Sequence, residues 1–255
     1  MALPIETFSN VAGGNAFYKA VTHPLASDAA RNLVAKLQSA ASVALYDPQQ
    51  LLAGFDAFFP LDRVNIAGLF VQDAQQIGRR FRGIGARPIT ELCECDAGVV
   101  LIAAFDTKTI ESQLRQFAGR AQMVSFDLLR LPDNMLSDRN RYLSNLNFAT
   151  NFAFFRDSPG QHTRLSTVNY WVAYGGRGEA IRFILFGDRG AILADWTTPL
   201  PPANGLVTVD SRAIRKRFDL PPFTGQLFMH VVGAAGHDVV KYALDTYGDS
   251  PDVLS

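Results

Sequence analysis

The stretch Val64–Phe117 most constrains the fold, because it alternates short apolar runs with glycine, proline and aspartate. Two of its apolar runs, Ile66–Val71 and Gly98–Ala104, contain no charged side chain. Runs of that length and composition are typical of parallel strands that are buried on both faces of an α/β sheet. Such sheets bind ligands at the carboxyl ends of their strands. The stretch therefore predicts both a fold class and the edge at which a ligand site would lie.

The first half of the chain is expected to form a single doubly wound α/β unit over residues 1–135, including a helical lead-in, because predicted strands and helices alternate along it. Its predicted strands cover residues 42–46, 64–71, 98–104 and 122–126, with an extended piece at 82–88, a helical turn at 89–95 and a helix at 107–117. Right-handed crossovers between such strands bring their carboxyl ends to one edge of the sheet.

Two further helices are predicted on either side of the first strand. Ser27 or Asp28 is a suitable cap for the first of them. Its buried face then carries Ala30, Leu33, Val34 and Leu37. Asp47 and Pro48 are typical of the cap and the first turn of the second helix, which is expected to run to about Phe58.

The composition changes near Leu131, where helical periodicity fades and aromatic residues become frequent. Short β-like runs are separated there by turn sequences at residues 157–160, 175–178, 187–190 and 201–205. This pattern predicts an antiparallel β-sandwich over residues 145–255, with the domain boundary between Leu131 and Asn145. One helix, Ser211–Phe218 with Asp210 as its cap, is expected within it. Because the chain stops in a polar segment after an apparent strand, we interpret it as a fragment of a longer protein.

The charge balance excludes whole classes of partner. The 255 residues carry 24 basic and 24 acidic side chains, so no general field attracts nucleic acid or an anionic membrane. The basic run Arg79–Arg82 is interpreted as a solvated edge. No apolar stretch reaches the roughly 20 residues that span a bilayer, and residues 1–6 do not resemble a signal peptide. We expect a cytoplasmic protein that has neither nucleic-acid nor membrane partners.

A recognisable string runs through the predicted sheet: Asp73, Gly78, Gly83-Ile-Gly-Ala-Arg-Pro88, Glu91-Leu92, and Asp96 before an apolar strand. It resembles the Rossmann-like module found at the N-terminus of sugar acyltransferases and at the C-terminus of sugar C-methyltransferases. CoA-binding and redox-sensing Rossmann domains look similar. The resemblance covers Ser42–Phe126, about a third of the chain. It implies a Rossmann-like fold that binds a nucleotide sugar, CoA or NAD(P), with Asp73 holding a ribose.

The first strand-to-helix turn departs from that family pattern. The family usually places a Gly-x-Gly-like loop there, so that backbone can approach a phosphate. This chain has Tyr46-Asp-Pro-Gln-Gln50 and no glycine before Gly54. Pro48 lacks an N–H group, and Asp47 puts a carboxylate where the phosphate would sit. We therefore expect dinucleotide binding to be lost or much weakened, which disfavours NAD(P) or a nucleotide sugar as cofactor. The candidate cofactor-binding residues are Asp47, Asp73 and Arg82; Asp73 is otherwise read as a turn or cap residue.

The second half holds the candidate ligand-binding residues His162, Arg164, Tyr170 and His237. The first three are expected to alternate onto one face of a single strand. His237 follows the flexible turn Gly233–Gly236. These residues define two hypotheses, a metal or acid–base site and a sugar-binding surface.

Neither hypothesis is favoured by the spacing. A metal or acid–base site would bring His162 and His237 together with His230 and Asp238, but no compact metal spacing is present. The lone pair Cys93 and Cys95 supplies only two of the four ligands of structural zinc, so no metal is expected. A sugar platform would use Arg164 with Tyr170, Trp171 and Tyr174, whereas the favoured interpretation puts Trp171 and its neighbours in the core.

No complete set of catalytic residues is present, since the chain lacks both a Gly-x-Ser-x-Gly elbow and a phosphate-binding loop with Gly-Lys-Ser/Thr. The preferred hypothesis is a non-catalytic or accessory two-domain module. It would bind a protein partner or a sugar-nucleotide-like ligand in surface-carbohydrate metabolism, a role that rests on the resemblance alone. The alternatives are an enzyme dependent on NAD(P) or a nucleotide sugar, and a carbohydrate-binding β-sandwich on an α/β scaffold.

Overall fold

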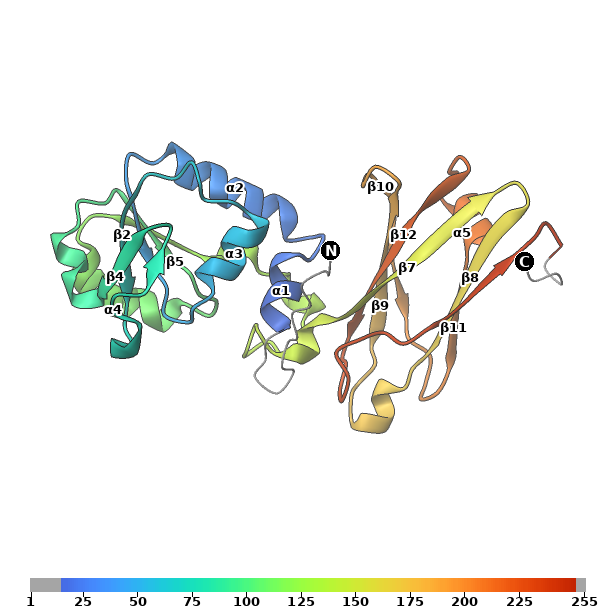
Figure 1. Cartoon of the computed structure of the whole chain (residues 1–255). Coiled ribbons are helices and arrows are strands. Elements are labelled where there is room, and N and C mark those ends of the chain that lie inside the picture. The colour runs from blue at the N-terminus through green and yellow to red at the C-terminus, as the bar shows by residue number, and fades with distance from the viewer. Residues whose placement is uncertain (1–14, 251–255) are drawn as a thin grey trace, which may run out of the picture. The chain divides into compact units, whose positions relative to one another are not determined.

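The computed structural model describes residues 15–250, which belong to two compact units (Figure 1). The first unit comprises Met1–Leu131 and Arg141–Leu143, and the second comprises Pro132–Asn140 and Ser144–Ser255. The chain thus passes between the units inside the interval in which the composition changes. Each unit has its own sheet and its own buried core.

The first unit contains a mixed sheet of six strands in the order β3-β4-β2-β1-β5-β6. Five strands are parallel: β1 (Val43–Tyr46), β2 (Ile66–Val71), β4 (Ile84–Pro88), β5 (Val99–Ile102) and β6 (Gln122–Ser125). The edge strand β3 (Arg80–Phe81) runs antiparallel to β4. In register, Tyr46 at the end of β1 lies opposite Phe70 and Ile102. The segments that follow β1, β2 and β5 therefore leave the sheet at one edge.

The described part of this unit contains four α-helices: α1 (Ala16–Val21), α2 (Ser27–Ser39), α3 (Leu52–Phe58) and α4 (Lys108–Ala118). It also contains 3₁₀ segments at Ala74–Gln76, Ile89–Glu94 and Phe126–Leu129. Helix α2 buries Ala30, Leu33 and Leu37, as its periodicity predicts, while Val34 is only partly buried. Over residues 15–250, no helix combines the length and the apolar character needed to cross a bilayer.

Two predictions about helix starts were wrong. Helix α3 begins at Leu52 rather than at Pro48, because residues 48–50 form a turn in which Gln50 has a left-handed φ of 58°. No side chain caps the start of α2, so neither Ser27 nor Asp28 has the expected role.

The second unit contains one antiparallel sheet of seven strands. They are β7 (Ala149–Ser158), β8 (Gln161–Val168), β9 (Ala180–Gly187), β10 (Ile192–Pro199), β11 (Leu206–Asp210), β12 (Phe223–Val232) and β13 (Ala243–Tyr247). Strand β7 pairs with β8 at only two positions beside their turn, but with β12 at nine. Beyond that turn β8 pairs with β11 and β13. The strands therefore form two arms, β10-β9-β12-β7 and β11-β8-β13, joined at the β7–β8 hairpin.

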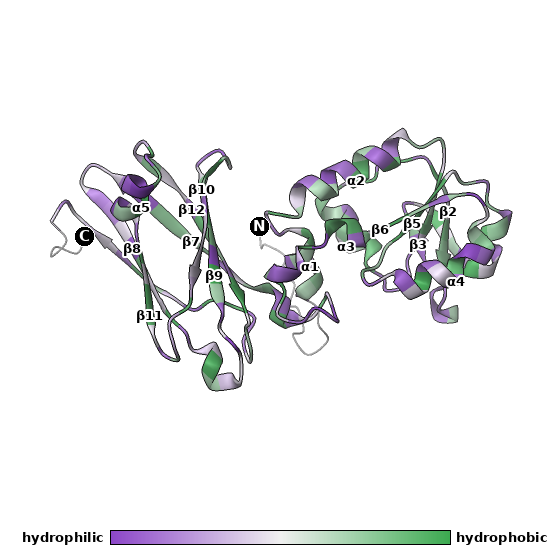
Figure 2. Ribbon diagram, turned by 180° about the vertical axis from the view of Figure 1, so that it is seen from behind, coloured by the Kyte–Doolittle hydropathy of each residue, from purple (hydrophilic) through white to green (hydrophobic). Residues whose placement is uncertain are grey.

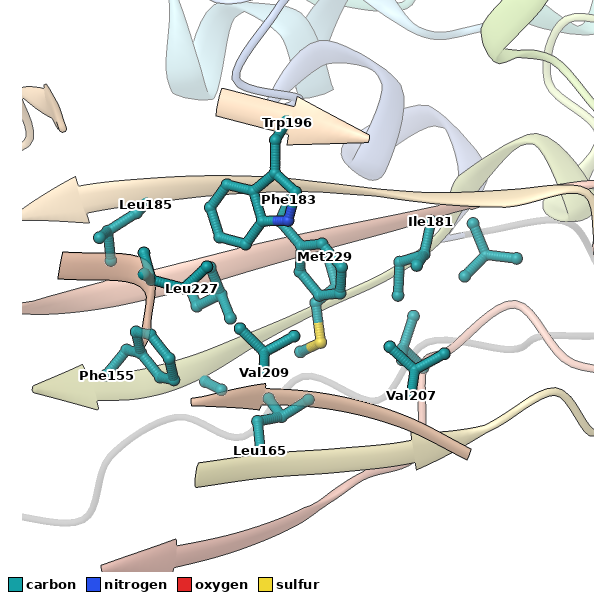
Figure 3. Packing of buried hydrophobic residues seen from close by; sticks show 14 of the residues in the cluster. Phe155, Leu165, Ile181, Phe183, Leu185, Trp196, Val207, Val209, Leu227 and Met229 are labelled. Atoms are coloured by element: carbon teal, nitrogen blue, oxygen red, sulfur yellow. The ribbon is translucent and has the colours of Figure 1, made fainter. Parts of the chain in front are cut away.

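Side chains from both arms meet in one apolar core. Figure 3 shows Phe183 and Met229 from one arm facing Leu165 and Val209 from the other. Trp171, from the 3₁₀ segment Trp171–Tyr174, is fully buried in the same cluster, as the core interpretation predicts. Because Trp196 also belongs to this cluster, both tryptophans of the chain report on the second unit.

Helix α5 (Ser211–Arg217) confirms its predicted cap. The Asp210 carboxylate accepts hydrogen bonds from the N–H groups of Arg212 and Ala213, at 3.0 and 3.3 Å. Ile214 is buried in the core beneath the helix. The last turn carries Arg215, Lys216 and Arg217, and the helix is strongly hydrophilic in Figure 2. The basic side chains of this helix can therefore contribute to a neighbouring site.

His230 should make the stability of the second unit depend on pH. It is fully buried on β12, where its Nε2 donates to the Met135 carbonyl at 2.9 Å, and burial lowers its pKa to about 4 from 6.5. Because the unfolded chain takes up this proton first, stability present above about pH 6.5 is lost as the pH falls toward about 4. We expect a loss of about 3 kcal/mol from this group.

The measurement is urea unfolding followed by tryptophan fluorescence across that pH range. The variant His230→Gln should lack this part of the pH dependence. An unchanged pH profile in the variant would contradict the assignment.

Gly225 should be irreplaceable on β12. A Cβ at this position would lie 1.8 Å from the Phe186 carbonyl oxygen of the paired strand β9. Gly225→Ala must therefore push the two strands apart and should lower the free energy of unfolding by about 2 kcal/mol. Gly248→Ala is the control, since nothing lies within 4 Å of the added atom. Equal unfolding midpoints for the two variants would show that the pairing is misassigned.

Candidate functional site

The carboxyl edge of the parallel sheet is occupied by the Asp47 carboxylate. This side chain is fully buried, and its Oδ1 accepts hydrogen bonds from the N–H groups of Leu51 and Leu52 at 2.8 and 3.2 Å. Its Oδ2 accepts a hydrogen bond from Arg79 Nη2 at 2.6 Å. Burial raises the pKa of Asp47, while the Leu52 N–H and the Arg79 guanidinium oppose that rise. Two N–H groups at the start of α3 are thus bound by the Asp47 side chain, which is the competition that the sequence predicts.

Arg79 is the partner that sequence reasoning missed. The basic run Arg79–Arg82 was interpreted as a solvated edge, but Arg79 neutralises Asp47 and Arg82 forms an ion pair with Asp56 at 2.8 Å. Arg80 and Arg82 are nevertheless exposed, as a solvated edge implies, whereas Arg79 is only partly exposed. Arg79 is 32 residues from Asp47, and no motif spacing signals a pair so far apart.

A second carboxylate occupies the neighbouring crossover. Asp127 follows β6 and accepts hydrogen bonds from the N–H groups of Asp106 and Thr107, both at 2.8 Å, just before α4. The Thr107 hydroxyl also donates to it, at 2.7 Å. Arg130 forms ion pairs with both Asp106 and Asp127. Two adjacent crossovers at this edge therefore have amides bound by carboxylates that are neutralised by arginine.

The other predicted cofactor residues also have partners within the chain. Asp73 is exposed and accepts a hydrogen bond from the Gln75 N–H at 2.9 Å, which makes it the cap of the segment Ala74–Gln76. This is the turn-forming role weighed against ribose binding. Arg82 is held by Asp56 on α3. Among the described residues, no hydrogen bond or ion pair joins Asp73 or Arg82 to Asp47.

A cavity of about 320 Å³ lies nearby, between α4 and the segment Ile89–Glu94. Ile110, Leu114 and Phe117 contribute its apolar lining. The Tyr46 hydroxyl lies at its edge and donates to Gln72 Oε1 at 2.9 Å. No charged residue lines the cavity, so it offers a diphosphate no cationic partner. Cys93 and Cys95 are free thiols, and burial raises the pKa of Cys95.

The second unit holds a larger, charged cavity of about 440 Å³. It lies between the β7–β8 turn, helix α5 and the segment after β13. His162 contributes to its lining, together with Arg212, Arg215 and Lys216 from α5 and with Asp157 and Asp249. This volume is in the range of small-molecule sites.

His162 lies between two carboxylates in this cavity. The imidazole is buried, and its Nδ1 lies 2.6 Å from Oδ1 of the equally buried Asp157. Asp157 Oδ2 also accepts a hydrogen bond from Arg215 Nη1 at 3.1 Å. His162 Nε2 lies 3.1 Å from Asp249 Oδ1. Asp157 thus fixes the orientation of the ring, so that Nε2 faces the cavity.

Asp249 differs from Asp157 in exposure, because its side chain is 74% exposed. Its Oδ1 accepts a hydrogen bond from the Gly160 N–H at 3.2 Å, in addition to the contact with His162. Its backbone carbonyl accepts a hydrogen bond from Arg212 Nη1 at 2.9 Å. The hydrogen bonds with His162 and Gly160 lower the pKa of the Asp249 carboxyl.

The predicted ligand-binding set does not assemble into one site. Arg164 lies near His162 but pairs with Asp210 at 3.3 Å and stacks over the Tyr247 ring. Tyr170 lies beyond the end of β8 rather than on it, so the expected alternation onto one face stops short of this residue. His237 packs against Tyr170 and Tyr174, with ring centroids 6.0 and 4.8 Å away.

The predicted ligand-binding residues are therefore separated, because β8 ends at Val168. His162 and Arg164 lie at the start of β8, whereas Tyr170 and His237 lie past its end. His230 is buried on β12 against Met135. Within residues 15–250, no three histidine, cysteine or acidic side chains are arranged to hold a metal ion. Trp171 is buried, as the favoured core interpretation predicts, and Arg164 pairs with Asp210, so these residues do not form the alternative sugar platform.

Comparisons with known proteins add little. No family model matches the sequence, and no curated protein matches it. Among solved structures, the chain has a weak likeness to Pseudomonas aeruginosa AlgX, with 6% sequence identity and a TM-score of 0.18. The alignment covers 76% of this chain and 48% of the AlgX chain, so this chain spans about half of that length. A likeness of this size identifies neither fold nor function.

The Asp47 cap should be measurable by mutation. Asp47→Ala removes the acceptor of two backbone N–H groups and leaves Arg79 without its partner, so the free energy of unfolding should fall by about 2 kcal/mol. Asp47→Asn keeps one acceptor oxygen and should cost less. Amide hydrogen exchange should quicken at Leu51 and Leu52 in the alanine variant.

Asp73→Ala is the matched control, because it removes an exposed aspartate cap with one hydrogen bond. It should leave exchange at Leu51 and Leu52 unchanged. If Asp47→Ala left exchange at both amides unchanged, the capping role would be refuted.

Proposed function

We propose that this chain is a non-catalytic or accessory binding module, whose α/β unit is a scaffold without a working dinucleotide site. One observation carries the proposal: at the carboxyl edge, Asp47 and Asp127 each bind two backbone N–H groups at or just before the start of a helix. A diphosphate binds to free N–H groups at a helix start. Part of that donor set is here already bound by the chain's own carboxylates.

An incoming phosphate would also have to compete with Asp47 for Arg79 and for the Leu51 and Leu52 amides. Moving Asp47 aside would in turn leave Arg79 unpaired and expose two amides. An enzyme dependent on NAD(P) or a nucleotide sugar is therefore the less favoured alternative.

The fold supports the wider family assignment. Numbered along the chain, the five parallel strands lie in the order 3-2-1-4-5, which is the order of doubly wound dinucleotide-binding sheets and supports a Rossmann-like unit. The two arms around one core support a β-sandwich in the second unit. The resemblance to modules of sugar acyltransferases and sugar C-methyltransferases then suggests a role in surface-carbohydrate metabolism, with a protein or a sugar-nucleotide-like ligand as partner.

The charged cavity favours a second candidate function, a carbohydrate-binding β-sandwich on an α/β scaffold. Unlike the cavity beside α4, it is lined by charged groups, including the buried pair His162 and Asp157. Both functions assign ligand binding to the second unit. They differ in whether the first unit retains a ligand of its own.

A thermal-shift screen tests the proposal. A ligand present at about 100 times its dissociation constant adds about 2.7 kcal/mol of stability. NAD(H), NADP(H), CoA and UDP-sugars should therefore leave the unfolding temperature unchanged, while simple and acidic glycans are screened for a shift. A shift with any dinucleotide would overturn the proposal.

The variant Asp47→Gly should give a thermal shift in the same screen. It removes the carboxylate and adds the glycine that the family pattern carries, so phosphate-containing ligands should gain affinity. Asp73→Ala serves as the comparison, because it removes an equal charge outside the capped turn. A dinucleotide shift that appears only in Asp47→Gly would support the blocking role of Asp47.

A further inference from the structure

We propose that the cavity beside His162 is a carboxylate-binding site and that Asp249 occupies it as an internal ligand. The occupant that Asp249 would give way to is the carboxylate of an acidic sugar. This inference rests on the proposed function, because it names the ligand class of the second-unit site. It also assigns to Asp249 a role in controlling access to that site.

The donor geometry carries the first step. His162 Nε2 and the Gly160 N–H converge on one oxygen, Asp249 Oδ1, at 3.1 and 3.2 Å. A backbone N–H and an imidazole N–H that meet at one point are a suitable pair for a carboxylate oxygen. The imidazole is aimed by the buried Asp157 at its other nitrogen. The two donors are thus held in place by the fold, whichever carboxylate they bind.

The exposure of Asp249 carries the second step. Its donors belong to a buried histidine and a hairpin turn, whereas its own side chain is 74% exposed. An ion pair with one partner this exposed contributes little to stability, because water screens it. A competing carboxylate therefore has little to overcome at this position, and a larger ligand gains further contacts in the cavity.

The charge of the lining carries the third step. With Asp249 displaced, the charged groups that remain are Arg212, Arg215, Lys216, Asp157 and Asp219, beside His162. Three of these five are cationic and two are anionic, so the lining is net positive without any contribution from His162. Lys216 and Arg212 lie on the exposed basic side of α5, and Lys216 forms no ion pair among the described residues.

The size of the cavity selects the ligand class. A volume of about 440 Å³ is larger than a free carboxylate needs and suits a ring with substituents. A hexuronic acid combines such a ring with one carboxylate and several hydroxyls. The cavity lining is polar and charged, which matches those hydroxyls. A neutral hexose lacks the group that His162 and Gly160 would bind.

The test is a titration of the full chain with glucuronate, monitored by calorimetry and by the amide NMR signal of Gly160. Asp249→Asn should bind glucuronate about tenfold more tightly than the unmodified chain, because the competing charge is gone. Asp245→Asn is the matched control, since Asp245 is an exposed carboxylate on β13 outside the cavity lining, and it should bind like the unmodified chain. His162→Gln should abolish binding.

Glucose and acetate separate the possible sources of affinity. Glucose should not bind, and acetate should bind Asp249→Asn more weakly than glucuronate does, because it makes no ring contacts. Tryptophan fluorescence verifies that each variant is folded, and Arg212→Gln provides an exposed second variant that should weaken glucuronate binding if His162→Gln is unfolded. Equal affinities of the unmodified chain and Asp249→Asn, or no glucuronate binding by either, would overturn the inference.

The outcome is distinguishable from failure of the proposed function. A dinucleotide-induced thermal shift would remove the scaffold role of the first unit, whatever the glucuronate titration shows. If neither dinucleotides nor glucuronate bound, only the assignment of an acidic-sugar ligand would be wrong.

Discussion

Asp47 is a buried carboxylate at the carboxyl end of the central strand β1. Three donors from its own chain bind it, namely the N–H groups of Leu51 and Leu52 and the Arg79 guanidinium. This arrangement decides what the first unit can hold, because the same donors would otherwise face a ligand anion. The charge of Asp47 remains buried only because Arg79 neutralises it and two amides bind it. A structural ion pair therefore lies at the carboxyl end of β1.

The two units use the same chemistry with different consequences. In each of them a carboxylate from the chain occupies donors that suit an anion. Asp47 is fully buried, so its removal disturbs the fold around it. Asp249 is largely exposed and lies on a segment after the last strand, so its removal leaves the core untouched. Burial therefore distinguishes a carboxylate that belongs to the fold from one that a ligand can replace.

Local patterns along the chain predict much of the architecture. The apolar runs of the first half correspond to strands β1, β2, β5 and β6, and the Asp210 cap starts α5 as expected. The predictions are wrong where the local sequence pattern does not reveal where a helix starts or a strand ends. Asp47 caps a helix that begins only at Leu52, because the chain inserts a turn at Gln50. Tyr170 was assigned to the face of a strand that ends two residues earlier, at Val168.

The sequence by itself determined most strands of the first unit, the cap of α5 and the presence of an acid in the first crossover, because caps and periodicity act over a few residues. Tertiary structure alone decided which charges meet. Arg79 reaches Asp47 across 32 residues, and Asp249 reaches His162 across 87. Neither pairing can be predicted from the sequence spacing, because the order of the strands and the path of the chain bring these groups together. The separation of His162 from His237 has the same cause, because it depends on where one strand ends and how the next segment folds back.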